Sequence, residues 1–228
     1  MFILTFNTLS NNMSVAIAKY DKIISKKIIT QPSRHSELLI STIQDALTEA
    51  KIDYQDLDLV AMPVYPGSFT SSRISYVAAN IMRLALKISV IALDKSDIMA
   101  WKYRNICSND LLVIFACNNH EFYVTKYQPF DRYLNKKEDT KIYAMKDLCN
   151  LIAGNNYNCV ATNKSQIMNF DPKLKNKLRK SFLDLKENEV EIEDIVLYAN
   201  YVYSNNSFKD KILCDSNDLK YLRQPNIN

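Results

Sequence analysis

The order of apolar runs along the chain is the feature that most restricts its fold. Three runs lie close together at residues 2–6, 13–20 and 23–30, and only short turn-competent stretches separate them. This spacing predicts three consecutive strands. Two amphipathic segments, at 33–51 and 70–87, then alternate with two short apolar runs. The order strand, strand, strand, helix, strand, helix, strand indicates an α/β lobe with a mixed sheet and helical crossovers.

A second sheet is expected in the other half of the chain. After a short helical stretch at 96–103, two strands joined by "NNH" are predicted at 111–117 and 121–127. The later elements predicted are a helix at 144–154 closed by Gly154, a strand at 157–163 and a mostly apolar helix at 191–206. A helix that is apolar nearly all round is buried by its own chain or by a partner. The chain is thus expected to form two lobes, residues 1–100 with a ribonuclease H-like strand order and residues 101–228 as a second, more divergent lobe.

Glycine is scarce, with two residues in a chain of 228, whereas about one residue in fourteen is usual. Turns and ligand loops must therefore form largely without it. The formal net charge is +4 and the pI is near 8.6. These values are compatible with an acidic partner such as RNA, but a dedicated nucleic-acid binder is expected to be more basic.

The five cysteines form no C-x-x-C pair, and they are Cys107, Cys117, Cys149, Cys159 and Cys214. An odd number without metal-binding spacing favours buried thiols in a reducing compartment over a disulfide framework. The first 20 residues lack a basic region ahead of an apolar run, and no segment is long enough to cross a membrane. We expect a cytoplasmic protein without a membrane contact.

The stretch "VYPGSFTSSR" at 64–73 joins a predicted strand to a predicted helix. The simpler interpretation is a tight turn at Pro66 and Gly67, with Ser68 or Thr70 capping the helix. The alternative is an anion site at the helix N-terminus with Arg73 nearby. The simpler interpretation is preferred, and both stay open from the sequence.

Three motifs carry a family resemblance: "PSRHSELL" at 32–39, "PGSFTSSR" at 66–73 and "LKYLRQP" at 219–225. With them the chain resembles the bacterial TsaB family. That family supplies a partner subunit to the machinery that adds threonylcarbamoyl to the adenosine beside the tRNA anticodon. The resemblance is best over residues 2–100 and rests beyond that on "EFYVTKY" and "YLR". It implies two lobes of the actin, hexokinase and heat-shock ATPase superfamily.

The resemblance also implies that this chain has lost parts of a nucleotide site. Asn7 stands where the superfamily has an aspartate for hydrated magnesium, and Val64 and Ser71 replace glycines beside "PGSFT". In the second half Ala116 stands in place of an acid. We therefore expect a degenerate phosphate loop formed by Asn7, Thr8, Pro66, Gly67, Ser68, Phe69, Thr70 and Arg73. ATP and metal are expected on partner chains and not on this chain alone.

Residue types for catalysis are not arranged as an active site. His35 and His120 are the only histidines and have no second ligand at zinc spacing. There is no G-x-S-x-G elbow for a hydrolase. The lysine-rich run at 164–180 is interpreted as a solvated face, with contact to tRNA phosphates as the alternative. No catalytic residue and no metal ligand is predicted.

The segment 70–87 carries an apolar stripe beyond the one that its own sheet requires. The stripe expected in the core consists of Ile74, Val77, Ala78, Ile81, Leu84 and Ile88. The stripe expected at a partner interface consists of Ser75, Ala79, Met82 and Leu86, with Leu38 and Ile40 from the preceding helix. Coverage by the chain's own second half is the alternative, and the resemblance favours a partner because TsaB pairs with TsaD through these helices.

The sequence thus predicts a noncatalytic scaffold. The resemblance implies a TsaD-type catalytic subunit and a TsaE-type ATPase as partners, indirect action on tRNA, and a possible homodimer when the chain is alone. The rival is an enzyme of the same superfamily, either a nucleotide-dependent phosphotransferase or a glycopeptidase-like hydrolase. Asn7, the missing glycines and the missing histidine pair argue against the rival.

Overall fold

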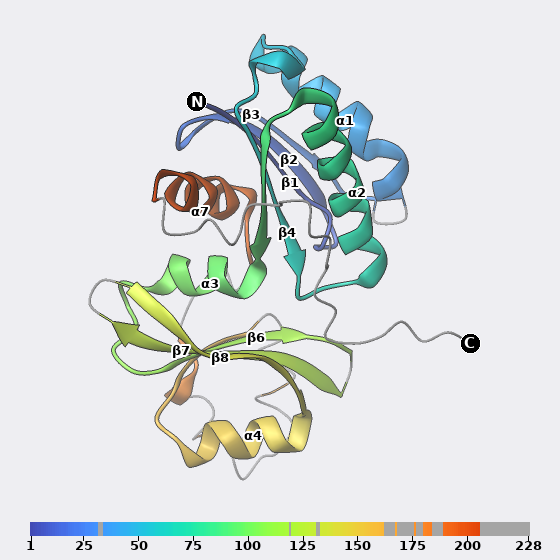
Figure 1. The fold of residues 1–228 in the computed structure, drawn as a ribbon. Helices are drawn as coiled ribbons and strands as arrows, with labels where there is room; N and C mark the ends of the chain where they lie inside the picture. The colour runs from blue at the N-terminus through green and yellow to red at the C-terminus, as the bar shows by residue number, and fades with distance from the viewer. Residues whose placement is uncertain are drawn as a thin grey trace. The chain divides into compact units, whose positions relative to one another are not determined.

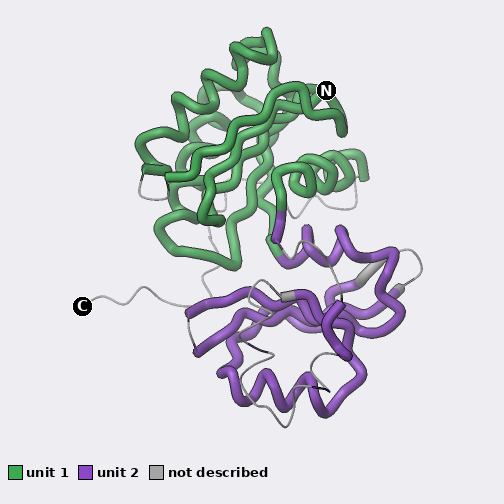
Figure 2. The backbone as a smooth tube through the Cα atoms, turned by 180° about the vertical axis from the view of Figure 1, so that it is seen from behind, with its two compact units in different colours: residues 1–95, 191–228 green, residues 96–190 purple. Residues whose placement is uncertain are grey.

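The computed structural model divides the chain into two compact units (Figure 2). The first contains Met1–Lys95 and the chain from Glu191 onward, and the second contains Ser96–Val190. The residues described are 1–31, 34–118, 120–130, 133–161, 167, 176, 180–183 and 189–205. Outside them lie Pro32 and Ser33 of "PSRHSELL", Asn119 of "NNH", Cys214, "LKYLRQP" and all lysines and arginines of the 164–180 run except Lys180.

A five-stranded mixed sheet forms the first unit, as the sequence predicts. Its strands are β1 (Phe2–Asn7), β2 (Met13–Lys19), β3 (Lys22–Ile29), β4 (Leu59–Tyr65) and β5 (Ser89–Asp94). Their order is β3-β2-β1-β4-β5. The first three pair antiparallel, whereas β1, β4 and β5 run parallel, so the crossovers fall where helices were expected. This is the ribonuclease H-like order.

Helices cover both faces of this sheet. α1 (His35–Ala50) and α2 (Phe69–Leu86) lie side by side on one face, and α7 (Ile192–Ser204) lies on the other (Figure 1). A short 3₁₀ helix at Tyr54–Asp56 precedes β4. Because side chains alternate along a strand, Leu4 and Phe6 point to the α1 and α2 side, where they enter the core.

The position of α7 corrects the expected lobe boundary. The sequence interpretation placed everything after residue 100 in the second lobe, but α7 contacts β1, β2 and β4 of the first sheet. Its apolar side is buried there, including Ile195, Val196 and Ala199. The helix is therefore covered by its own chain, which was one of the two options left open. The N-terminal part of the first unit also ends at Lys95, whereas the sequence interpretation placed the boundary after residue 100.

The second unit has four strands in the order β8-β7-β6-β9. Its elements are α3 (Lys95–Tyr103), β6 (Leu111–Ala116), β7 (Glu121–Phe130), β8 (Tyr133–Ala144), α4 (Met145–Gly154) and β9 (Asn158–Ala161). With β6 parallel to β9 and antiparallel to β7, this order repeats that of the first four strands in the first unit. The strand β8 was not predicted, because its run "NKKEDTK" is charged and β8 pairs along one edge only.

Several turns use residues other than glycine in the left-handed backbone region. Tyr20, Lys51 and Lys87 have φ values of 57°, 57° and 56°. Lys51 and Lys87 end α1 and α2, where glycine is the common choice because it lacks a Cβ. This confirms that the chain makes its turns without glycine. No helix within the described ranges is both long and apolar enough to cross a membrane.

We expect Lys87→Gly to raise the free energy of unfolding by about 0.5–1 kcal/mol, because it relieves the left-handed strain at the end of α2. The matched control is Ala85→Gly, two residues earlier inside α2, which should lower stability by about 1 kcal/mol. Denaturant unfolding of the two variants measures both. Equal losses in both variants would contradict the strain at Lys87.

Candidate functional site

The expected phosphate loop lies at the carboxyl ends of two neighbouring parallel strands. β1 ends at Asn7 and β4 at Tyr65, and α2 begins four residues after β4. Ligands of α/β sheets commonly bind at such strand ends, in front of a helix N-terminus. The structure thus brings the predicted residues from the end of β1 and the start of α2 to one place.

Asn7 is almost fully buried and holds its own turn together. Its Oδ1 accepts a hydrogen bond from the backbone N–H of Leu9 at 2.9 Å, and its Nδ2 donates to Ser10 Oγ at 3.1 Å. The side chain is neutral, and both of its polar atoms are already used. It therefore offers neither charge nor a free oxygen to a hydrated cation, which prefers carboxylates.

Thr8 connects the end of β1 to the first turns of α2. Its hydroxyl donates to the backbone oxygen of Ser71 at 2.8 Å, and it lies 2.7 Å from Ser75 Oγ. Both Thr8 and Ser75 are completely buried. These contacts occupy the helix side of the loop with groups of the chain itself.

Gly67 packs directly against Leu9. A Cβ built on Gly67 would lie 2.9 Å from Leu9 Cδ2 and 3.4 Å from Leu9 Cβ and Cγ. Gly67 does not have a positive φ, so the backbone conformation does not demand glycine here. Glycine is required at position 67 because any side chain there would collide with Leu9.

The start of α2 agrees with the simpler interpretation of "PGSFT". Ser68 is the N-cap, and its Oγ accepts from the N–H of Ser71 at 3.4 Å. Pro66 is buried after a cis peptide bond, and Thr70 is exposed. The exposed Arg73 lies over the Phe69 ring, with Cζ 4.0 Å from its centroid. Arg73 therefore stacks on its own helix.

The residues present do not fit a magnesium-bound nucleotide. The acid is replaced by Asn7, the approach beside Gly67 is filled by Leu9, and Thr8 is bonded to α2. Among the described side chains, no group of three or more His, Cys, Asp or Glu could hold a metal ion. His35 begins α1 and is buried, and its Nε2 has no hydrogen-bond partner within the described part of the chain.

The expected partner stripe on α2 is wrong. Ser75 and Ala79 are completely buried and Met82 is 6% exposed, all within the core of the first unit. Leu86 and Leu38 are half-buried against the same core. Small side chains lie beneath α2 because the helix packs closely on β4 and β5. Of the residues proposed for the interface, Ile40 is exposed.

A different apolar stripe faces outward. Val77, Ile81 and Leu84 of α2 are 54%, 60% and 64% exposed, and Ile40 of α1 is 52% exposed. The three α2 residues follow the spacing i, i+4, i+7 and share one helix face. We call these four residues the α1/α2 face. The sequence interpretation placed Val77, Ile81 and Leu84 in the core stripe, but of that stripe Ala78 is buried and Ile74 and Ile88 are partly buried against the core.

In the second unit, Ala116 stands in place of the expected acid, and the turn that follows it is held by hydrogen bonds within the turn itself. Ala116 ends β6, and Asn118 Oδ1 accepts from the N–H groups of His120 and Glu121 at 2.8 Å and 2.9 Å. Asn118 Nδ2 donates to Glu121 Oε2 at 2.6 Å. His120 lies in this turn, as predicted. The side-chain amide of Asn118 therefore stabilises the turn between β6 and β7.

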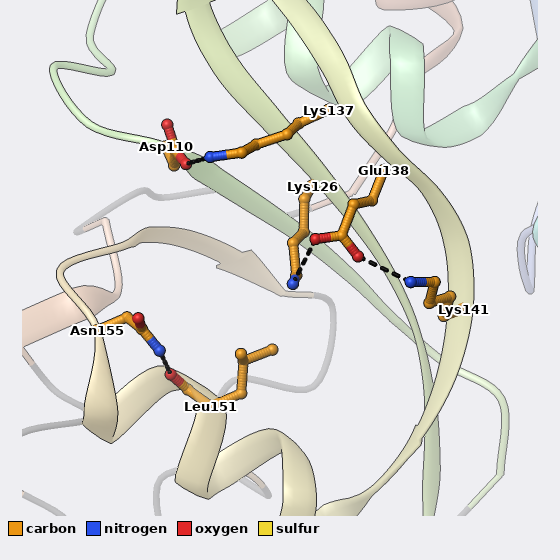
Figure 3. A network of polar contacts seen from close by, with 7 residues as sticks. All are labelled: Asp110, Lys126, Lys137, Glu138, Lys141, Leu151 and Asn155. Atoms are coloured by element: carbon orange, nitrogen blue, oxygen red, sulfur yellow. Dashed lines mark hydrogen bonds and ion pairs between the residues drawn. The ribbon is translucent and has the colours of Figure 1, made fainter.

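Charged side chains on β7 and β8 form a network that the sequence did not reveal (Figure 3). Glu138 accepts from Lys126 at 2.8 Å and from Lys141 at 2.9 Å, and Lys137 donates to Asp110 at 2.8 Å. The hydrogen bonds from Lys126 and then Lys141 lower the pKa of Glu138 from 4.5 to about 2. Lys126 and Lys141 share Glu138, and Lys137 pairs with Asp110, so the network stabilises the sheet and carries one net positive charge.

A known family model matches most of the chain. Residues 22–208 match the family model "TsaD: tRNA N6-adenosine threonylcarbamoyltransferase". The chain belongs to this family, as a TsaB-type member. TsaB of Buchnera aphidicola subsp. Acyrthosiphon pisum is 31% identical over 117 residues, 50% of this chain and 52% of the relative. TsaB of Bacillus subtilis is 25% identical over 130 residues, 56% of each chain.

The matched stretch spans little more than half the length of these curated TsaB relatives. The fold match is wider. The structure of YeaZ from Pseudomonas aeruginosa has a TM-score of 0.70, with 18% identity, over 89% of this chain and 92% of that chain. This confirms the α/β fold with two lobes. Both curated relatives are named as tRNA threonylcarbamoyladenosine biosynthesis proteins.

Glu138→Gln tests the charge network in the TsaB-type chain. Because the folded-state pKa is lowered, the stabilisation by Glu138 is present above about pH 4.5 and is lost as the pH falls towards 2. The side chain is 32% exposed, so solvent screens the pair and we expect a loss of roughly 1 kcal/mol at pH 7.

The difference from the wild type should shrink between pH 4.5 and 2.5 in denaturant titrations. The control is Glu37→Gln, whose partner Arg34 is an exposed neighbour on α1, and it should change stability by less than about 0.5 kcal/mol. A pH-independent loss at Glu138 would show that the charge is not the cause.

Proposed function

We propose that this TsaB-type chain is a noncatalytic partner subunit that supports threonylcarbamoyl transfer to tRNA by binding a TsaD-type catalytic subunit. The observation that carries the proposal is the α1/α2 face. Four large apolar side chains on two adjacent helices are each more than half exposed. Single exposed apolar residues are ordinary, but a row at helical spacing is typical of an interaction surface.

A second pair of helices is the occupant that fits this face. Two antiparallel or crossed helix pairs can bury such rows in a common core, as in helix bundles. A TsaD-type chain is a suitable partner because the same family model describes both proteins and would supply a helix pair of the same fold. The match to a tRNA N6-adenosine threonylcarbamoyltransferase of Ligilactobacillus salivarius, 31% identical over 105 residues, supports this relation.

The catalytic parts are assigned to partner chains. The loop at the end of β1 does not suit ATP and magnesium, because Asn7 is neutral and Leu9 fills the space beside Gly67. We propose that ATP, metal and the main tRNA contacts belong to the TsaD-type subunit and a TsaE-type ATPase. The same loop counts against a nucleotide-dependent phosphotransferase or a glycopeptidase-like hydrolase within this chain.

The thiols fit a complex in a reducing cytoplasm. Burial raises the pKa of Cys107 to about 11 and raises that of Cys159 further. Both therefore stay protonated near neutral pH and are poor nucleophiles. This supports a structural role for them.

Two adjacent residues of α2 test the proposed interface. Ile81→Glu places a charge on the α1/α2 face, so the lone chain should keep its free energy of unfolding within about 0.5 kcal/mol. Binding to the TsaD-type partner should weaken about a thousandfold, because a buried unpaired charge costs roughly 4 kcal/mol. Met82→Glu puts the same charge into the core and should unfold the lone chain.

Thermal melting and native mass measurement, with and without the TsaD-type partner, read out both effects. Normal pairing by folded Ile81→Glu would refute the α1/α2 face. Native mass measurement also detects a homodimer of the lone chain. If it is disrupted by Ile81→Glu and the TsaD-type partner does not compete with it, the proposed partner is wrong.

A further inference from the structure

We infer that residues Asn7 to Ser10 form an internal clasp on α2, which fixes the rotation of the helix without a bound nucleotide. We call these four residues the β1 clasp. The inference deepens the proposed function, since α2 carries most of the α1/α2 face. It starts from the disagreement between the residues present and the nucleotide that a loop in this position would otherwise bind.

The hydrogen bonds define how the clasp holds α2. The Thr8 hydroxyl has one proton, and it donates that proton to the backbone oxygen of Ser71. The contact with Ser75 at 2.7 Å must then have the Ser75 hydroxyl as its donor. One buried oxygen therefore joins the first and second turns of α2 to the end of β1.

The register of Ser75 makes this contact sensitive to rotation. Ser75 lies in line with Ala79 and Met82 on the buried side of α2, opposite Val77 and Ile81. A turn of α2 about its axis would separate the hydroxyls of Thr8 and Ser75 and would move the exposed row at the same time. The clasp contact and the exposed row thus lie on opposite sides of α2, and both depend on the same rotation of the helix.

Packing on Gly67 gives the clasp its second hold. In a phosphate loop, glycine allows a ligand oxygen to come near the backbone. Here the approaching group is the side chain of Leu9, 2.9 Å from where a Cβ of Gly67 would lie. Asn7 fixes Leu9 in turn, by accepting its N–H. Leu9 therefore packs against the turn that precedes α2, while Gly67 and Ser68 themselves stay exposed.

The consequence is an α1/α2 face that is ordered in the absence of nucleotide. Hydrogen exchange of the full chain tests this directly. In Thr8→Val, which keeps the shape of Thr8 but removes its hydroxyl, we expect the amides in the first two turns of α2 to exchange about tenfold faster. Thr8→Ser keeps the hydroxyl and should restore slow exchange.

The control is Thr48→Val, which removes an exposed hydroxyl that donates to Gln44 on α1. It should leave exchange in α2 unchanged. Addition of magnesium and ATP to the wild type should not slow exchange at residues 7–10 or 67–71. The clasp is refuted if Thr8→Val leaves α2 unchanged, or if the nucleotide protects the loop of the wild type.

The clasp and the proposed partner can fail separately. Hydrogen exchange in α2 is measured on the lone chain, so this test of the clasp does not depend on any partner. If the wild type does not bind the TsaD-type subunit while exchange responds as expected, the proposed function fails and the clasp stands. If binding occurs and Thr8→Val changes neither exchange nor binding, the clasp fails alone.

Discussion

The close approach of α2 to the first sheet is the constraint on which the rest of the first unit depends. Four of the five buried residues of α2 are small, namely Ser72, Ser75, Ala78 and Ala79, and the fifth is Met82. The small side chains let this part of the helix approach the sheet closely. Val77, Ile81 and Leu84 therefore lie on the outer side, where a surface of the molecule becomes apolar.

The same constraint creates a need for polar partners beneath the helix. Serines buried against a sheet must bond their hydroxyls, since an unpaired buried hydroxyl costs about 1–3 kcal/mol. Ser72 donates to the backbone oxygen of Ser68, within its own helix, whereas Ser75 reaches Thr8 at the end of β1. The small residues that bring α2 close thus also connect it to the loop that would otherwise be open to a ligand.

Much of the fold could be predicted from the sequence because it depends on periodicity and order. The strands β1 to β7 and the helices α1, α2 and α4 follow apolar patterns. β8 could not be found in this way, because it is charged and is defined by its pairing with β7. The placement of α7 needs contacts between distant segments, and an apolar stripe alone does not say which sheet covers it.

The site was predictable in location but not in the role of each residue. Asn7, Thr8 and Gly67 were assigned to a degenerate phosphate loop, and the structure brings them together. Leu9 was missed because an apolar residue in a turn carries no chemical signal. The core stripe predicted for α2 was wrong at Val77, Ile81 and Leu84, because helical spacing alone does not say which of two neighbouring stripes faces the sheet.

The energies of the clasp indicate why a nucleotide would compete poorly for this position. Opening the loop breaks two hydrogen bonds of Thr8, worth about 0.5–1.5 kcal/mol each. It also exposes the buried part of the half-buried Leu9 side chain, at about 1–2 kcal/mol. The sum, roughly 2–5 kcal/mol, corresponds to a loss of about 30-fold to several thousandfold in apparent affinity. With Asn7 unable to add a carboxylate for magnesium, little remains to offset that cost. Thr8 and Leu9 thus hold the start of α2 against the end of β1, and the exposed row of α2 keeps a fixed position.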